Sequence, residues 1–353
     1  MRRHLKEFVR TELFPGRALP PSTSRRFYPT KKDIHNHMYR AIVKNRFSNC
    51  DQTNVGAKIN LWQAQYPSDK FHFRPFEEIN SSNEDAFTDD DDYDDDDEEE
   101  EIEVKVTKPI TSQKLLFVHQ TSWQQRLLSM YGNNICLLDA TYKTTRYSLP
   151  LFFLAVKTNV DYQVVASFII QNESTDSIKE ALGILKQWNP VWNPPFFMTD
   201  FSEEEITAVE ETFPDCTVYL CDFHREQAWE RWVNKKDNGV SGQKEEVLSK
   251  LRQIARASTE EIYQKAVFNL KDSQLWKRNI KIQKWFGNKW IKASKRWVWA
   301  FREEGFAVMV NTNNGLERQN KLFKYSYLHN HKNTSLSGML NILIENSFQR
   351  STT

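Results

Sequence analysis

Five short apolar runs, and the distances between them, constrain most strongly what this chain can fold into. Each run is rich in leucine, β-branched or aromatic residues and is bounded by polar turns, which is the pattern of a buried strand. The runs cover residues 135–139, 149–156, 162–170, 195–200 and 216–221. Only short polar turns separate the first three, so we expect those three strands to form an antiparallel meander.

Helical segments separate the later runs. Ser177-Ile-Lys-Glu180 and Ser202-Glu-Glu-Glu205 both have the Ser-x-x-Glu spacing of a capping box, so we expect each to open a helix. A strand–helix–strand order implies parallel pairing with right-handed crossovers. The sequence therefore predicts an α/β fold with a ribonuclease-H-like mixed sheet, in which three antiparallel strands precede two parallel strands and helices cover both faces. In this arrangement the ends of the first and fourth runs lie side by side.

Three further segments are expected to be helical. Residues 114–130 lead into the first run as a helix, and residues 243 to about 300 form a helical insertion. A last helix carries Glu317 near its start. The insertion is expected because 117 residues (317 − 200) separate Asp200 from Glu317, far more than one strand and two connections require.

An acidic run divides the chain. Residues 84–103 hold 15 of the 47 acidic residues and no lysine or arginine, so this low-complexity segment is predicted to be disordered. It acts either as a solvated linker or as a DNA mimic that blocks a basic surface. We expect four parts: an N-terminal leader or small accessory unit (1–80), an acidic linker (81–110), the ribonuclease-H-like domain (111–330) and a C-terminal tail helix (331–353).

Charge and composition limit the class of protein. The formal net charge is +1, but without the acidic run 48 basic residues face 32 acidic ones (47 less 15), the balance of a phosphate-backbone binder. No stretch reaches the ~20 continuous apolar residues of a membrane span, and the start of the chain lacks the apolar segment of a signal peptide. Four cysteines in 353 residues do not suggest a disulfide scaffold, so we expect a reducing compartment, cytosol or nucleus.

Three acidic residues form the candidate catalytic site. Asp139 closes the first apolar run, Asp200 closes the fourth, and Glu317 lies on the last predicted helix. Two carboxylates at strand ends and one on a helix are suitable ligands for two Mg²⁺ or Mn²⁺ ions in phosphodiester chemistry. We expect Asp139 to bridge both ions, Asp200 to bind one and Glu317 the other. A strand-end aspartate alone is also a common turn or helix-cap residue, so the hypothesis depends on all three occurring in this order.

The last predicted helix carries further polar groups beside Glu317. Asn320, Lys321 and Lys324 follow at i+3, i+4 and i+7, so all four share one helix face. An amide and two lysines beside a metal-binding carboxylate are suited to phosphate, although an ordinary polar surface face has the same pattern. Lys143, in the turn after the first run, is either a further DNA contact or a solvated lysine.

A basic, tryptophan-rich stretch lies in the predicted insertion. Residues 276–302 contain five of the eleven tryptophans and nine basic residues, with no acidic residue. Basic side chains interleaved with aromatic rings can follow a nucleic-acid backbone and stack on bases. In the alternative interpretation, the tryptophans pack the core of the insertion while the lysines face water. The absence of acids favours DNA contact by the polar face. The candidate DNA contacts are Lys284, Lys289, Lys292, Lys295 and Arg296.

Cys221-Asp-Phe-His224 follows the fifth run and contains residue types that bind zinc. A tetrahedral structural zinc site needs four ligands, and only Cys216 joins these two nearby. We therefore expect no zinc here. Cys221 and His224 are expected instead to be packed, hydrogen-bonded residues that support the edge of the catalytic site, as is Asn320.

Four short motifs resemble those of Mutator-like-element (MULE) transposases. They are Leu138-Asp-Ala-Thr-Tyr-Lys143, Phe197-Met-Thr-Asp200, Cys221-Asp-Phe-His224 and Asn311-Thr-Asn-Asn-Gly-Leu-Glu317-Arg-Gln-Asn320. The resemblance covers about residues 115–330 and implies a DDE-type recombinase that nicks transposon ends and joins them to target DNA. It maps the acidic triad onto Asp139, Asp200 and Glu317. It also maps the family's Cys-x-x-His motif onto Cys221 and His224. Residues 25–34 are more faintly similar to the leader of animal proteins derived from such elements.

The resemblance implies Mg²⁺ or Mn²⁺ in a two-metal site, transposon-end and target DNA as partners, a homo-oligomer on DNA, and a place in the nucleus. MULE transposases usually carry an N-terminal zinc-binding recognition domain, and many carry a SWIM zinc finger; neither Cys/His array occurs in this sequence. Three interpretations stay open. The chain is a transposase domain, including a fragment or decayed copy of one; a domesticated DNA-binding transcription regulator without catalysis; or a ribonuclease-H-like nuclease unrelated to transposition.

Overall fold

The computed structural model describes residues 6–30, 33–34, 50–77, 113–240, 242–303, 320–328 and 334–347. The chain divides into two compact units, Met1–Ala57 and Lys58–Thr353. The first unit contains η1 (Val9–Leu13) and the start of α3 (Asp51–Gln65). The candidate site belongs to the second unit. The acidic run and Glu317 lie outside the described residues.

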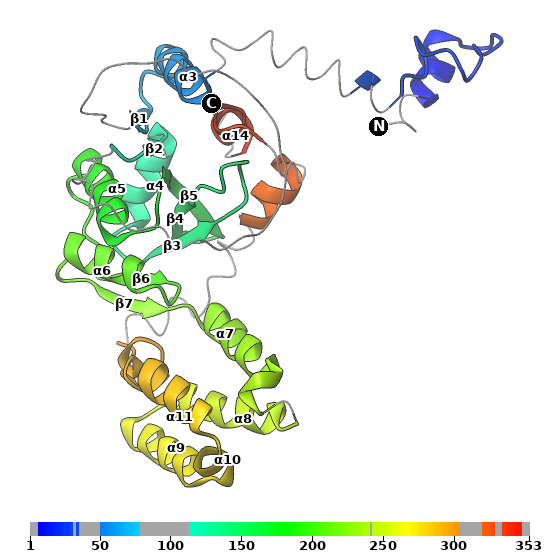
Figure 1. Cartoon of the computed structure of the whole chain (residues 1–353). Helices are drawn as coiled ribbons and strands as arrows, with labels where there is room; N and C mark the ends of the chain where they lie inside the picture. The colour runs from blue at the N-terminus through cyan, green and yellow to red at the C-terminus, as the bar shows by residue number, and fades with distance from the viewer. Residues whose placement is uncertain are drawn as a thin grey trace, which may run out of the picture. The chain divides into compact units, whose positions relative to one another are not determined.

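The second unit is built on a seven-stranded mixed sheet with the strand order β1-β2-β5-β4-β3-β6-β7 (Figure 1). The strands are β1 (Lys70–Arg74), β2 (Leu116–Gln120), β3 (Cys136–Thr141), β4 (Leu151–Lys157), β5 (Tyr162–Ile170), β6 (Phe196–Thr199) and β7 (Thr217–Leu220). β3, β4 and β5 form an antiparallel meander, β6 is parallel to β3, and β7 is parallel to β6. The predicted ribonuclease-H-like order of three antiparallel and two parallel strands is confirmed.

The register between β3 and β6 determines where the two strand-end aspartates lie. Leu137 of β3 pairs with Met198 of β6, and the strands run parallel. Asp139 and Asp200 each follow two residues later, so they reach the same level on neighbouring strands. In open α/β sheets, ligands bind outside this carboxyl edge.

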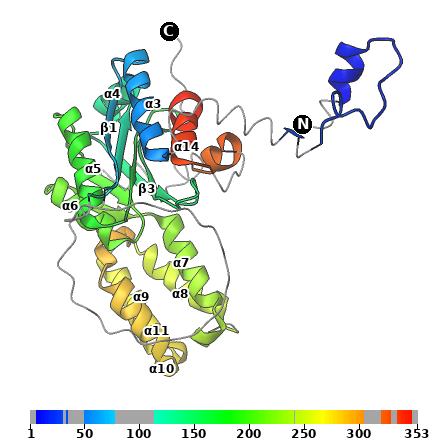
Figure 2. The same ribbon diagram turned by 45° about the horizontal axis from the view of Figure 1, so that its top comes forward.

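Helices cover both faces of the sheet, as Figures 1 and 2 show. Those nearest the sheet are α3, α4 (Ser122–Tyr131), α5 (Thr175–Trp188), α6 (Glu203–Thr212), η6 (Leu322–Tyr327), α14 (Leu336–Ile342) and η7 (Leu343–Ser347). α4, α5 and α6 enclose an apolar core on one face, to which Phe152 and Phe168 contribute stacked rings. In the described part of the chain, no helix combines the length and the apolar character needed to cross a bilayer.

A row of register partners crosses the opposite face and ends at Asp139. In order across the sheet, the row is Phe71, His119, Ser167, Phe153 and Asp139. Directly paired residues point to the same face of a sheet. Trp62 of α3 stacks on Phe71 with ring centroids 6.3 Å apart, and Phe323 of η6 meets Phe153 edge-on at 5.7 Å. The segments α3 and η6 therefore cover the face that carries Asp139.

β1 and β2 extend the sheet beyond the five predicted strands. The helix predicted over residues 114–130 is wrong in its first part, because Leu116–Gln120 is a strand and α4 begins only at Ser122. Thr121 determines this start: its hydroxyl accepts from the Gln124 N–H at 3.1 Å, and the Gln124 side chain accepts from the Thr121 N–H at 2.8 Å. β1, from the predicted N-terminal unit, pairs antiparallel with β2. The predicted domain boundaries themselves stay predictions.

The predicted helical insertion is confirmed. After α7 (Asp222–Asn234), it consists of η2 (Lys236–Asn238), α8 (Lys244–Ala255), α9 (Glu260–Asp272), α10 (Gln274–Arg278), α11 (Ile280–Trp285), η3 (Phe286–Ile291), η4 (Ser294–Arg296) and η5 (Trp299–Phe301). Trp290 and Trp297 are buried and meet each other and Trp229 edge-on, with centroids 5.5 to 5.9 Å apart. Trp276 and Trp285 pack against this core. Four of the five tryptophans of the basic stretch therefore serve the core.

Two segments far apart in the sequence hold each other beside the sheet. Lys58 Nζ of α3 donates to Asn341 Oδ1 of α14 at 2.7 Å. Trp62 Nε1 donates to Glu345 Oε1 of η7 at 3.2 Å. Each pair joins residues 283 positions apart, and both figures show α3 beside α14.

Candidate metal centre

Three side chains meet at the carboxyl edge of the sheet: Asp139 of β3, Asp200 after β6, and His224 in the first turn of α7. One potential ligand atom of each lies within 4.8 Å of the others. The two aspartates are level on parallel neighbours, and α7 begins immediately after β7, the next strand in the sheet. The fold thus brings together two predicted metal ligands and one predicted supporting residue.

Asp139 is buried and is held by a residue from the far end of the domain. Its side chain is 4% exposed, and Asn320 Nδ2 donates to its Oδ2 at 2.6 Å. The contact of Phe323 with Phe153, the register partner of Asp139, fixes this helical segment over the strand. The chain that follows Glu317 in sequence is therefore bound directly at Asp139.

Asp200 is paired with a cationic histidine. His224 Nδ1 forms an ion pair with Asp200 Oδ1. Burial lowers the pKa of His224, but hydrogen bonds to Asp200 and Cys221 outweigh burial and raise that pKa to about 11. Cys221 itself occupies the N-cap position of α7 and is buried. His224 therefore provides a positive charge at Asp200.

This pair predicts a pH-dependent stability. The pKa of His224 is about 11 in the folded state, against an ordinary value of 6.5, so the stabilisation is complete below pH 6.5 and is lost as the pH rises through 11. We expect the free energy of unfolding of the wild type to fall across this window relative to that of His224→Gln. Urea unfolding in EDTA at a series of pH values measures the difference. Equal pH slopes for the two proteins would mean that folded His224 is neutral.

Lys324, one of the predicted phosphate-binding lysines, senses the charge of Asp139. Burial lowers the pKa of Lys324, the Asp139 carboxylate raises it, and the charge of Lys143 lowers it further. Lys324 is therefore within electrostatic range of Asp139, and Lys143 is within range of Lys324. Lys143 has a left-handed backbone conformation, with a φ of 61°, in the turn after β3. Lys321, on the same segment as Lys324, is exposed.

The insertion presents lysines to solvent beside Asp200. Those predicted to contact DNA, Lys284, Lys289, Lys292 and Lys295, are at least partly exposed. Lys289 Nζ lies 4.5 Å from the ring centroid of Phe201, the residue after Asp200. The Phe201 ring packs against Trp290 at 5.0 Å. The basic surface of the insertion therefore begins next to the acidic site.

Arg296 differs from these lysines because it has protein partners. Its Nη1 forms an ion pair with Glu210 Oε1 at 2.7 Å and donates to the Val218 carbonyl at 3.3 Å. These interactions attach η4 to α6 and β7. A DNA contact by Arg296 would have to compete with them.

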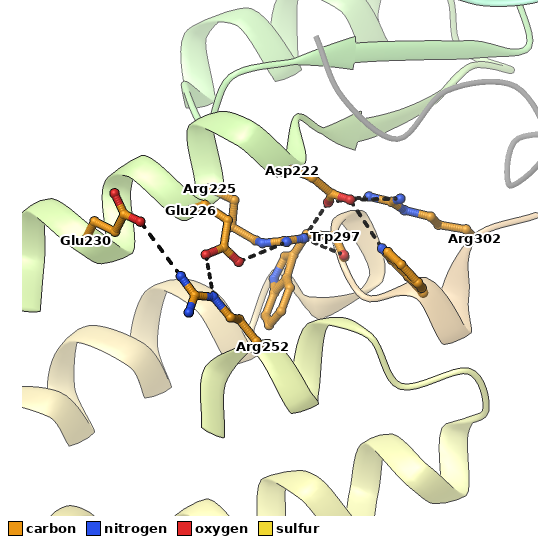
Figure 3. Close-up of polar contacts among 8 residues, drawn as sticks. Asp222, Arg225, Glu226, Glu230, Arg252, Trp297 and Arg302 are labelled. Carbon is orange, nitrogen blue, oxygen red and sulfur yellow. Dashed lines mark hydrogen bonds and ion pairs between the residues drawn. The ribbon is translucent and has the colours of Figure 1, made fainter. Parts of the chain in front are cut away.

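A buried ion-pair network behind His224 attaches α7 to the end of the insertion (Figure 3). The Asp222 carboxylate accepts from Arg225, from Arg302 Nη2 at 2.7 Å and from Trp299 Nε1 at 3.2 Å. The side chains of Arg225 and Arg302 are only 4% and 2% exposed. The first residue of α7 is thus bound to residues some 80 positions later in the chain.

The network continues from α7 to α8. Arg225 Nη2 lies 3.6 Å from Glu226 Oε1, and Arg252 Nε of α8 lies 2.9 Å from Glu226 Oε2. Arg252 Nη2 reaches Glu230 Oε1 at 3.7 Å (Figure 3). Alternating charges therefore bind both ends of the insertion to α7.

A buried carboxyl group that the sequence assigned only to a capping box lies within electrostatic range of the site. Glu205, in the first turn of α6, is 2% exposed. Burial, and after it the charges of Asp200 and Asp139, raise the pKa of Glu205 well above its ordinary value. Close by, Tyr142 Oη donates to Glu173 Oε2 at 2.5 Å. The only sequence signal for Glu205 is its position five residues after Asp200, at the start of the helix that follows the strand.

The donor set suits a hard divalent cation. Mg²⁺ and Mn²⁺ prefer carboxylate oxygens, and two carboxylates within 4.8 Å repel each other unless positive charge lies close to them. Asp139 and Asp200 would hold the cation, with the His224 nitrogen in the same group. Within the described ranges, neither Cys216 nor Cys221 belongs to a cluster of potential metal ligands. The participation of Glu317, and with it a second ion, stays a prediction.

Comparison with known protein families agrees with this fold. Residues 94–219 match the family model of the zinc finger SWIM domain-containing protein 1/3, RNaseH-like domain. The match includes Asp139 and Asp200 and ends before Cys221 and His224. Comparison with curated protein sequences gave no match. The chain therefore contains a ribonuclease-H-like domain similar to that of SWIM zinc-finger proteins 1 and 3, which supports the fold implied by the MULE resemblance without selecting that family.

Proposed function

We propose that this protein is a MULE-type DDE transposase domain that catalyses metal-dependent cleavage and transfer of DNA strands. The observation that carries the proposal is the meeting of Asp139 and Asp200 at the ends of parallel strands, with Asn320 bound to Asp139. The third predicted carboxylate, Glu317, is three residues before Asn320. Residues at i and i+3 share a helix face, so the predicted helix would direct Glu317 toward the same site.

Each residue has a distinct role in this proposal. Asp139, Asp200 and Glu317 would hold the divalent cations. Bound Mg²⁺ or Mn²⁺ supplies activation of the attacking oxygen and stabilisation of the leaving oxygen. Asn320 and His224 position the two aspartates through the hydrogen bond and the ion pair described above. Lys324, which the Asp139 carboxylate influences electrostatically, and Lys143, which influences Lys324, would bind the reacting phosphate.

The DNA path follows from the exposed lysines. From Asp200 it continues over Lys289 and the neighbouring lysines of the insertion, which face solvent. Transposition joins two transposon ends to a target, so we propose a homo-oligomer assembled on DNA, acting in the nucleus.

The lysine surface gives a quantitative prediction. Replacing Lys289 and Lys292 by Gln is expected to reduce the magnitude of the slope of log K against log salt by about 0.9 for each phosphate that the variant no longer neutralises. Fluorescence anisotropy with a labelled duplex, measured over a series of salt concentrations, tests this. The control is the double replacement of Lys265 and Lys271 by Gln, since both are exposed on α9 and lie outside residues 276–302. Equal slopes for the two double variants would remove this surface from the DNA path.

Metal-dependent cleavage tests the function itself. We expect the protein to nick supercoiled plasmid DNA, and duplexes carrying the inverted repeats that flank its gene, in Mn²⁺ or Mg²⁺ but not in EDTA. Cleavage restricted to the repeats supports a transposase, whereas cleavage without preference supports a ribonuclease-H-like nuclease. DNA binding with no cleavage in either metal would leave the domesticated transcription regulator as the remaining interpretation.

A further inference from the structure

A further buried carboxyl group, that of Glu205, lies within electrostatic range of the candidate metal centre. Glu205 is 2% exposed, and its Oε2 accepts no hydrogen bond from the described residues. Buried polar groups in folded proteins nearly always have a partner, and an unpaired one calls for a specific explanation. The strongest charge effects on Glu205 come from Asp200 and then Asp139, the two predicted metal ligands.

The local structure turns this side chain inward. Glu205 is the third residue of α6, where a capping box would direct its carboxylate back to the N–H of Ser202. Only half of that box forms: the Ser202 hydroxyl accepts from the Glu205 N–H at 3.3 Å and donates to Glu204 Oε2 at 3.0 Å. At the start of α4, by contrast, both halves form between Thr121 and Gln124. The Glu205 carboxyl is therefore released from the helix end.

The surroundings of Glu205 explain what could satisfy it. Its charged neighbours, in order of effect, are Asp200, Asp139, Glu173 and His224, so three of the four are acidic. Glu173 already accepts the Tyr142 hydroxyl, and His224 is already paired with Asp200. A buried carboxyl among other carboxylates is destabilising unless positive charge joins them. A divalent cation between Asp139 and Asp200 would supply that charge.

We propose that Glu205 is an outer carboxylate of the divalent-cation site, binding a water on the cation held by Asp139 and Asp200. The inference rests on the proposed function, because it requires a cation at these aspartates. It goes beyond the acidic triad in assigning to α6 a residue that stabilises the loaded site. In the metal-free protein the same side chain is a destabilising element.

Mn²⁺ binding to the full-length chain tests this inference, with free Mn²⁺ measured by electron paramagnetic resonance. Glu205→Gln keeps the shape of the side chain and removes its charge, and we expect it to weaken Mn²⁺ affinity about 10-fold or more, as loss of supporting groups at metal sites does. The control is Glu203→Gln, an exposed residue of the same helical turn, which should bind Mn²⁺ like the wild type. Glu205→Asp retains a carboxylate and should bind more tightly than Glu205→Gln.

Thermal unfolding separates this role from a structural one. In EDTA, Glu205→Gln should unfold at a temperature no lower than that of the wild type. The increase in unfolding temperature that Mn²⁺ produces should be smaller for Glu205→Gln than for the wild type. Wild-type Mn²⁺ affinity in Glu205→Gln, or a lower unfolding temperature in EDTA, would overturn the inference. Suppose that one of these results is found, that the wild type binds Mn²⁺, and that Asp139→Asn does not. The role of Glu205 is then rejected, but the cation site itself is not. If the wild type itself binds no Mn²⁺, the proposed function fails as well.

Discussion

Replacing Asp139 by Asn is expected to lower metal-dependent DNA cleavage by at least about 10³-fold, because metal ions contribute several kcal/mol to stabilising the transition state and each 1.36 kcal/mol is tenfold in rate. Asn has the size of Asp and can still accept a hydrogen bond from Asn320, so the fold should persist. What it lacks is the negative charge that would bridge the two ions. Single-turnover cleavage in Mn²⁺, with DNA binding measured on the same samples, gives the comparison.

The matched control for Asp139→Asn is Asp215→Asn. Asp215 is an exposed aspartate just before β7, so the same chemical change is made outside the site. It should cleave at the wild-type rate. Cleavage by Asp139→Asn within a few-fold of wild type would place the chemistry elsewhere. Loss of DNA binding together with cleavage would indicate a folding defect rather than a catalytic one.

Replacing Asp222 by Ala is expected to lower the free energy of unfolding by about 3–5 kcal/mol, the usual cost of removing one partner from a buried ion pair. The carboxylate of Asp222 receives both Arg225 and Arg302, and neither guanidinium is more than 4% exposed. Without Asp222, Arg225 keeps Glu226 at 3.6 Å, but Arg302 loses the ion pair that attaches the end of the insertion. Urea unfolding at neutral pH measures the change.

Asp237→Ala is the appropriate comparison for Asp222→Ala, because Asp237 is exposed in η2 at the other end of α7. A surface replacement of this kind changes stability by no more than about 0.5 kcal/mol. The loss of stability of Asp222→Asn should lie between those of Asp222→Ala and Asp237→Ala, because Asn retains the shape and an acceptor oxygen of Asp but not its charge. A loss below about 1 kcal/mol for Asp222→Ala would show that the two arginines find water or other acceptors.

The central strands were predictable because their sequences carry local information. The runs around β3 to β7 are short, apolar and separated by turns, and their order alone fixes which strand ends are neighbours. The start of α5 was harder to predict from the sequence. Ser174, not Ser177, caps this helix, and its hydroxyl accepts from the Ser177 N–H. Glu180 binds β1 instead, where its Oε2 lies 2.8 Å from Arg74 Nη2. Long-range pairing of this kind leaves no trace in a local pattern.

Some residues of the candidate site were likewise predictable from the sequence, and others were not. Asp139 and Asp200 follow from strand order, and Asn320 follows from helical spacing to Glu317. The ion pair of His224 with Asp200 and the inward turn of Glu205 depend on how α7 and α6 leave the sheet. At α6 the capping motif gives the helix start correctly but not the direction of its carboxylate. The roles of His224 and Glu205 can be inferred only once the burial of their side chains is known.

The hydrogen bonds that join α3 to α14 and η7 have a consequence for synthesis of the protein. The partners are 283 residues apart, so Lys58 and Trp62 leave the ribosome long before Asn341 and Glu345 exist. At roughly 5–20 residues per second, that delay is on the order of tens of seconds. During this time the ribonuclease-H-like strands can already pair, yet α3 lacks its acceptors. α14 and η7 therefore complete the interactions of α3, and this side of the domain is finished only after Glu345 has left the ribosome.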